Sequence, residues 1–244
     1  MTAARFFIDA PLAPDTDIDL PAAVAHHAVR VLRLRDGAPI VLFNGAGGEY
    51  AARLAVAGAT ARARIAGFDP VERESPLSIT LVQSWIASDK LDWVVEKSVE
   101  LGVNAIVLAP AQRSVVRLSG DRLQKRIDHL HEVPVAACSQ CGRNRIARIS
   151  CAPDLQSALE SALVRGACGV VLVPAAGDTL ASTAGSASYV LAVGPEGGFA
   201  EAEMAGAARL GYRGFRLGPR TLRTETAALA ALATLQATAG DFCG

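Results

Sequence analysis

Val193-Gly-Pro-Glu-Gly-Gly198 and Leu217-Gly-Pro-Arg-Thr-Leu-Arg-Thr-Glu-Thr-Ala227 are the two stretches that decide how this sequence folds. Each follows a short apolar run of the kind that forms a buried strand, at residues 189–193 and 214–217, and each leads into a predicted helix. Loops that leave the carboxyl ends of neighbouring parallel strands form the usual ligand crevice of an open α/β sheet. The two stretches therefore predict a binding site walled by two loops.

The second loop also carries charged side chains to this predicted crevice. Arg220, Arg223 and Glu225 lie within it or directly after it. Thr224 stands just before the last predicted helix, where a threonine side chain can serve as the N-cap. Each feature alone fits an ordinary turn, but glycines and charges together at two strand ends favour a ligand site.

Outward from these loops, strands and helices alternate from about residue 78 to the end of the chain. The predicted strands are 79–83, 105–108, 169–173, 189–193 and 214–217, and the predicted helices are 90–101, 121–140, 154–163, 200–210 and 225–238. Continuous apolar strands that alternate with helices indicate a parallel sheet with helices on both faces. We therefore predict an α/β domain over residues 78–244.

The first 70 residues show a different pattern. Strands are predicted at 39–43, 50–56 and 61–65, with a glycine-rich turn at 44–48 and a short helix at 22–32. A dinucleotide-binding loop would run into a helix, but here a strand follows, so a hairpin turn is favoured. This pattern predicts a small β-rich domain at 1–70, joined by a charged, proline-bounded linker at 71–77.

The composition sets limits on the class of protein. Hydrophobic residues make up 51% of the 244 residues and charged residues 20%, which excludes a disordered chain. No apolar run approaches the roughly 20 residues of a membrane helix, and Asp9 interrupts any signal-peptide core. The five cysteines are an odd number, which favours reduced thiols. These features predict a cytoplasmic globular protein without a membrane partner.

Positive charge is concentrated in one segment of a chain whose formal net charge is zero. Between residues 113 and 148 the sequence has three acidic residues, Asp121, Asp128 and Glu132. The same segment has eight cationic residues: Arg113, Arg117, Arg122, Lys125, Arg126, Arg143, Arg145 and Arg148. Such a segment fits a nucleic-acid contact, and it fits a solvated helix face equally well.

A tryptophan lies between two lysines on one face of the helix at 90–101. Lys90, Trp93 and Lys97 follow the spacing i, i+3 and i+7, while Leu91, Val94, Val95, Ser98 and Leu101 form the inward face. The tryptophan ring either stacks on a base between the two cations or packs under the neighbouring domain. Both alternatives stay open on the sequence.

Cys138 and Cys141 lie close to His129 and His131, which raises the question of a zinc site. All four residues fall in or just beyond the helix predicted at 121–140, where the two histidines point about 200° apart. Structural zinc sites draw their ligands from two separate elements. We therefore expect no metal here.

The last predicted helix is apolar on nearly every side. Leu229, Leu232 and Leu235 share one face, and alanines occupy most other positions of 226–236. Its own sheet can cover one side, and either the same domain or a second subunit covers the other. We favour the second subunit and expect a homodimer.

Together these motifs resemble the RsmE family of bacterial ribosomal RNA small subunit methyltransferases, within the SPOUT superfamily. Besides the two loops, the matching segments are 88–103, Arg113-Ser-Val-Val116, Gly142-Arg-Asn-Arg145, Arg5-Phe-Phe7 and 27–33. The chain departs from the family pattern at Ser139, at Cys141, where serine is usual, and at Gln112, where glutamate is common.

The resemblance implies an α/β fold of the SPOUT type, a parallel sheet with helices on both faces and a carboxyl-terminal trefoil knot, preceded by a PUA-like β-barrel. It implies S-adenosylmethionine as cofactor, an obligate homodimer, and methylation of uridine N3 in small-subunit (16S) ribosomal RNA. Two alternatives stay open: a SPOUT enzyme that methylates the ribose 2′-hydroxyl, and a non-catalytic RNA-binding or ribosome assembly protein.

Mapping the resemblance onto this chain gives three sets of expected site residues. The expected catalytic residues are Arg220, Arg223 and Glu225. The expected cofactor-binding residues are Val173, Pro174, Gly194, Pro195, Glu196, Gly198, Leu217, Gly218 and Leu222. The expected RNA-binding residues are Arg30, Arg33, Lys90, Trp93, Lys97, Arg113, Arg143 and Arg145.

Overall fold

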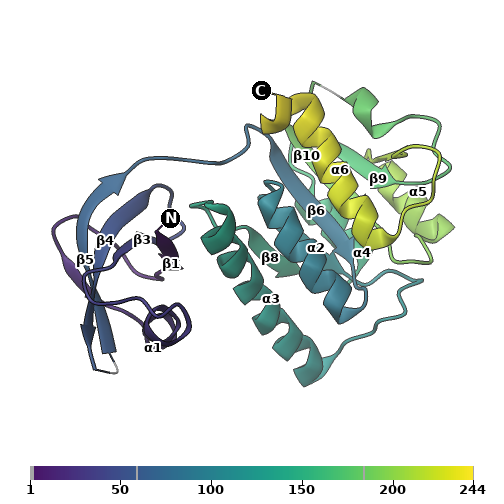
Figure 1. Ribbon diagram of the computed structural model, residues 1–244. Helices are drawn as coiled ribbons and strands as arrows, with labels where there is room; N and C mark the ends of the chain where they lie inside the picture. Colours follow the sequence, from purple (N-terminus) through teal and green to yellow (C-terminus); the bar gives the residue numbers. More distant parts are fainter. Residues whose placement is uncertain (1–2, 59, 184, 244) are drawn as a thin grey trace. The chain divides into compact units, whose positions relative to one another are not determined.

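The computed structural model describes residues 3–58, 60–183 and 185–243 of the chain (Figure 1). Its contacts divide the chain into two compact units. One unit comprises Met1–Glu74 together with Cys138–Ile146, and the other comprises Ser75–Ala137 together with Ala147–Gly244. The sequence analysis placed residues 138–146 in the second domain. In the structure they group with the first unit instead, because polar contacts around Glu49 hold them there.

The first unit is built on one five-stranded sheet in the order β1-β3-β4-β5-β2. The strands are β1 (Ala4–Phe7), β2 (Asp17–Asp19), β3 (Pro39–Phe43), β4 (Glu49–Ala57) and β5 (Thr60–Asp69). β1 pairs with β3 in parallel, and the other three pairings are antiparallel. The three predicted strands are confirmed as β3, β4 and β5, whereas β1 and β2 are too short to show a periodic pattern.

Alternation of side chains explains why these strands form a sheet with one buried face. In β5, Ala61, Ala63 and Ile65 are buried while Arg62 and Arg64 point to solvent. The helix predicted at 22–32 is confirmed as α1 (Ala22–His26) followed by a π-helical turn (His27–Val31). The apolar side chains of these elements form a single core cluster.

The glycine-rich stretch between β3 and β4 is a turn, as the sequence predicted. Gly48 has a φ of 66°, in the left-handed region that favours glycine. A Cβ atom at Gly48 would lie 2.4 Å from ring atoms of Phe68 in β5. The close approach of the aromatic ring and the positive φ both require glycine here.

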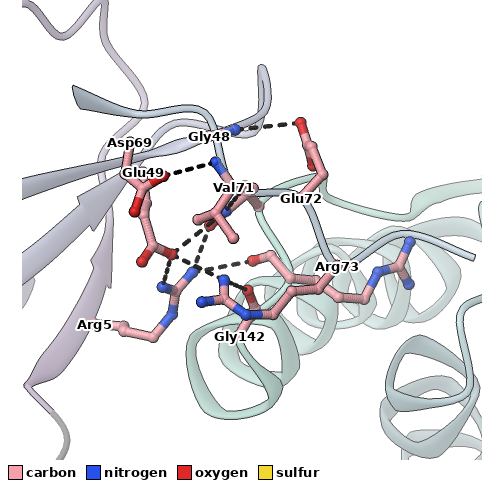
Figure 2. Close-up of polar contacts among 10 residues, drawn as sticks. Arg5, Gly48, Glu49, Asp69, Val71, Glu72, Arg73 and Gly142 are labelled. Atoms are coloured by element: carbon pink, nitrogen blue, oxygen red, sulfur yellow. Dashed lines mark hydrogen bonds and ion pairs between the residues drawn. The ribbon is translucent and has the colours of Figure 1, made fainter.

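Glu49, the first residue of β4, binds the segment 138–146 to the first unit (Figure 2). Its carboxylate accepts hydrogen bonds from Arg5, from Arg73 Nη1 at 3.0 Å and from Asn144 Nδ2 at 3.4 Å. Arg73 Nη1 also donates to the carbonyl of Gly142 at 2.9 Å. Arg5 Nη2 donates to Asn144 Oδ1 at 2.6 Å. One carboxylate thus joins three parts of the chain that are far apart in sequence.

The second unit contains a six-stranded sheet in the order β11-β9-β10-β6-β7-β8, and every strand pair is parallel. The strands are β6 (Ser78–Ser84), β7 (Ala105–Ala109), β8 (Arg148–Cys151), β9 (Cys168–Leu172), β10 (Ser188–Val193) and β11 (Arg213–Phe215). The five predicted strands are confirmed. The sequence analysis missed β8, because only Ile149 of its four residues is buried and no apolar run marks it.

The five predicted helices are also confirmed. They are α2 (Ser88–Glu100), α3 (Gly120–Cys141), α4 (Leu155–Ala162), α5 (Glu201–Arg209) and α6 (Thr224–Ala239), with short 3-10 helices at Leu180–Thr183 and Asp241–Cys243. Leu101 was predicted to lie on the inward face of α2, and this prediction is wrong, because the helix ends at Glu100. Val99 is buried on this helix instead. Among the residues described, no helix is both long and apolar enough to cross a membrane.

Helices cover both faces of the parallel sheet, as the sequence predicted. Leu155 and Leu159 of α4 and Ala207 of α5 pack with Val82 and Val107 on one face. Figure 1 shows α2 and α6 side by side against the other face. Both arrangements follow from strands that are apolar on two sides. The sheet therefore leaves only its edges and its strand ends accessible to a ligand.

We predict that Glu49→Gln lowers the free energy of unfolding at pH 7 by about 1–3 kcal/mol, because it removes the charge that three donors share. Burial alone would raise the pKa of Glu49, but hydrogen bonds from Arg73 and Arg5 outweigh it and hold this pKa below its ordinary value. The carboxylate therefore stabilises the fold above its unfolded pKa of about 4.3 and loses this effect as the pH falls through the folded pKa.

Chemical denaturation at several pH values measures the difference, and we expect the gap between wild type and variant to close at acid pH. Asp19→Asn is the matched control, because Asp19 pairs with Arg62 on an exposed part of the same sheet. It should change stability by no more than about 0.5 kcal/mol. Equal effects of the two substitutions would contradict a special role for Glu49.

Candidate active site

A cavity of about 470 Å³ lies at the carboxyl ends of β9, β10 and β11. Two loops form most of its wall: residues 194–198, which follow β10, and residues 217–223, which follow β11. The nine residues expected to bind cofactor all line it: Val173, Pro174, Gly194, Pro195, Glu196, Gly198, Leu217, Gly218 and Leu222. Arg220 and Arg223 also line it, whereas Glu225 does not.

A chain of hydrogen bonds fixes the two loops to each other. The Thr224 hydroxyl donates to the Gly194 carbonyl at 2.6 Å, and Gln83 Nε2 donates to the Thr224 hydroxyl at 3.3 Å. Gln83 and Thr224 are both buried. The expectation that Thr224 is the N-cap of the last helix is wrong, because Arg223 holds that position and Thr224 is the first helical residue. Its side chain is committed to the neighbouring loop instead.

The sequence analysis did not identify Gln83. The sequence did contain an indication of its role, because Gln83 is a polar residue at the end of an otherwise apolar strand. Such a residue is seldom buried without a hydrogen-bond partner. The partner is Thr224, 141 residues further along the chain, so the sequence could not reveal it.

The lining of the cavity suits a small ligand with an apolar body that approaches the backbone closely. Gly198 and Gly218 line it with φ values of 67° and 117°, and a Cβ atom on either would meet no protein atom within 4 Å. Ligand atoms can therefore approach the backbone at both positions. Leu217 and Leu222 supply apolar surface, and Glu196 is the carboxylate of the lining. The volume lies within the usual range of small-molecule sites.

Lys90 lies between two carboxylates at this end of the sheet. Its Nζ is 3.5 Å from Glu196 Oε1 and 3.5 Å from Glu225 Oε1. Glu225 Oε2 is buried and has no hydrogen-bond partner among the described residues. The lysine was expected to bind RNA, but its charge is shared by two acids of the site. It joins α2 to the loop after β10 and to the first turn of α6 through electrostatic attraction.

The other cations of the predicted RNA-binding set differ in their surroundings. Arg30 and Arg33 are exposed in the first unit. Trp93 is 45% exposed on α2, so its ring is available for stacking. Lys97 donates to both Glu96 and Glu100 at 2.7 Å, and these bonds neutralise its charge locally.

Arg143 does not fit the expectation that it contacts RNA. It is 4% exposed, and its Nε donates to Glu74 Oε1 at 2.9 Å. A buried guanidinium that is paired with a carboxylate stabilises the fold and cannot reach a phosphate. Arg145 stays a candidate for RNA binding because it is exposed, although its Nη2 lies 3.0 Å from Glu72 Oε1.

Cys138 and His129 of α3 have different partners. The Cys138 thiol is buried and donates to the Arg145 carbonyl at 3.4 Å, and the pKa of this thiol is raised by its hydrogen bond with Cys141 and by burial. His129 Nε2 lies 3.2 Å from Asp92 on α2. Within the described ranges, the structure contains no group of three or more metal-ligating side chains.

Two family models match the chain. An RNA methyltransferase domain matches residues 73–236, and an RNA methyltransferase PUA domain matches residues 20–61. The ribosomal RNA small subunit methyltransferase E of Mycobacterium bovis is 32% identical over 95% of this chain and 90% of its own length. The protein of the same name from Bacillus subtilis is 29% identical over 86% of each chain.

Solved structures agree with these relatives. A ribosomal RNA small subunit methyltransferase E from Neisseria gonorrhoeae, bound to S-adenosylmethionine, is 36% identical with a TM-score of 0.90 over 99% of this chain and 100% of that one. A methyltransferase from Legionella pneumophila, also in complex with S-adenosylmethionine, is 32% identical with a TM-score of 0.93 over the same shares.

We predict that Thr224→Val weakens binding of S-adenosylmethionine about fivefold or more. The variant keeps the shape of the side chain but leaves the part-buried Gly194 carbonyl without its donor, which costs about 1 kcal/mol. Isothermal titration calorimetry measures the affinity, and Thr224→Ser, which keeps the hydroxyl, is the matched control. Equal affinities of the valine and serine variants would show that this hydrogen bond does not hold the loops.

Proposed function

We propose that this chain, which belongs to the ribosomal RNA small subunit methyltransferase E (RsmE) family, methylates N3 of a uridine in small-subunit ribosomal RNA with S-adenosylmethionine as donor. One observation carries the proposal: all nine residues expected to bind the cofactor line one cavity at the strand ends. The two relatives solved with S-adenosylmethionine support the same assignment.

The reaction needs positioning more than covalent assistance from the protein. The cofactor, when bound, supplies a methyl group on a sulfonium, and the methyl moves in line to the nucleophilic nitrogen. Uracil N3 carries a proton at neutral pH, so this proton has to leave when the new bond forms. Because N3 lies on the base-pairing edge, the uridine has to be unpaired before it enters the site.

Side chains of the cavity can meet both requirements. Arg223 lines it and is placed to stabilise negative charge on a uracil oxygen as the N3 proton leaves. Glu196 also lines it and is our candidate for the proton acceptor. Both glutamates pair with Lys90, but Glu225 is outside the lining, so we assign it to positioning. Arg220 is a second cationic side chain of the wall.

Family membership also supports proposals on RNA binding, on the knot and on the cellular setting. The first unit corresponds to the PUA domain that matches within it, and we propose that it contributes to RNA binding. The trefoil knot stays a prediction of the sequence analysis. Since the substrate is ribosomal RNA, we also propose that the protein acts in the cytoplasm.

We propose a homodimer in which α6 packs against a second subunit. Its buried residues are Thr224, Ala228, Ala231, Leu232, Leu235 and Gln236, which cover one side of the helix. Leu229 and Ala230 are only partly buried by their own chain. An apolar helix that is partly exposed gains stability when a second surface covers it. The loop 217–223 directly precedes α6, so the cavity would lie near the subunit interface.

The proposed activity predicts one new nucleoside. Purified enzyme with S-adenosylmethionine and small-subunit RNA from a strain lacking the gene should yield N3-methyluridine on digestion and mass spectrometry. A methyl group on ribose would support the 2′-hydroxyl alternative. Binding of RNA without binding of S-adenosylmethionine would support the non-catalytic alternative, and either result would refute the proposed reaction.

The proposed dimer predicts that Ala230→Arg produces monomers and lowers methylation at least tenfold, because a charged side chain would have to be buried at the interface. Light scattering measures the mass, and methyl transfer is assayed at the same concentrations. Ala208→Arg is the matched control, because Ala208 is an exposed alanine of α5. A wild type that is monomeric while it methylates RNA would exclude the dimer.

A further inference from the structure

A second cavity, of about 520 Å³, lies at the carboxyl ends of β7 and β8 in the same unit as the first. Its wall includes Gln112 and Arg117 from the loop after β7, Asp154 and Leu155 at the start of α4, and Ala202 and Glu203 at the start of α5. None of these residues lines the first cavity. The proposed reaction as derived above leaves this space without a role.

The wall between the two cavities is well defined. Arg113 Nη1 donates to the Gly197 carbonyl at 3.2 Å, and Gly197 lines the first cavity. A Cβ atom at Gly197 would lie 3.1 Å from the Cβ of Arg113, so the loop after β7 packs directly on the loop after β10. The backbone N–H of Gln112 donates to Glu203 Oε1 at 2.9 Å. A ligand in the second cavity would therefore lie one loop away from the first.

The two carboxylates of the second cavity are already occupied by backbone groups. Asp154 accepts from the N–H of Ser157 at 2.7 Å, as the N-cap of α4. Glu203 accepts from the N–H of Ala200 at 2.8 Å as well as from Gln112. By contrast, the side chains of Arg117 and Gln112 have no hydrogen-bond or ion-pair partner among the residues the structure describes. Arg117 and Gln112 therefore offer a ligand an unpaired cation and an unpaired amide.

The surface beside this cavity is cationic and partly apolar. Arg113, like Arg117, is exposed and makes no ion pair with any residue in the described part of the chain. Val115 is 86% exposed on the same loop. Unpaired cations next to an exposed apolar side chain are suited to a single-stranded polyanion that also offers flat, apolar bases.

We propose that the second cavity binds a nucleotide of the substrate RNA that flanks the methylated uridine. Arg117 holds its phosphate, the Gln112 amide meets a base edge, and Leu155 and Ala202 supply apolar surface for the base or ribose. The volume suits one nucleotide. This inference rests on the proposed function, and it adds a subsite that selects the sequence or conformation of the RNA beside the reacting base.

The test measures methyl transfer to small-subunit ribosomal RNA by the full chain. Arg117→Gln should raise the KM for RNA about tenfold, as expected for the loss of one charge-assisted phosphate contact, and leave kcat within about twofold. Ala202→Phe fills the cavity from an exposed helical position without changing charge, and it should raise the KM similarly. Neither variant should change the Kd for S-adenosylmethionine or the Tm.

Arg122→Gln is the matched control, because it removes the same charge from an exposed position of the same basic segment but does not line the cavity. A subsite requires that both cavity variants raise the KM well above that of this control. A wild-type KM in Ala202→Phe, or equal effects of Arg117→Gln and Arg122→Gln, would overturn the subsite. If the wild type forms no N3-methyluridine at all, the proposed function fails first, and the two failures are thereby distinguished.

Discussion

All six strands of the second unit run in the same direction, and both cavities of that unit lie where these strands end. This constraint brings together loops from β7, β9, β10 and β11, although long helices separate them in sequence. Helices on both faces leave no other surface of the sheet open. The loops that follow the strands form both cavities described above, as is usual for an open α/β sheet.

The parallel arrangement brings the loops close together, but specific polar contacts fix their positions. Thr224 and Gln83 connect the ends of β10 and β6 with the start of α6 through buried hydrogen bonds. In a buried site such bonds cost little when they are satisfied and much when one partner is lost. These bonds fix the loop after β10 to the start of α6 on one side of the first cavity.

Charged side chains form ion pairs in some parts of the chain more than in others. The chain has equal numbers of acidic and basic residues, yet it pairs them unevenly. Glu49 and Glu74 bind arginines within the first unit, and Lys90 is shared by Glu196 and Glu225 at the first cavity. The loop after β7 has cations without acidic partners among the described residues. A neutral protein can in this way keep a cationic surface for RNA.

The sequence by itself determined most of the elements, though not β1, β2 or β8, and it determined the two loops of the site. Apolar runs and helical periodicity are local signals, so the strands ending at Val193 and Phe215 and the glycines that follow them were predictable. The tertiary structure alone decided which distant groups meet. It placed Arg143 against Glu74, 69 residues away, and thereby removed Arg143 from the RNA-binding set. It also gave Lys90 two acidic partners and Thr224 a carbonyl from another loop. Such contacts depend on how strands are ordered in a sheet, and residue spacing along the chain carries no record of that order.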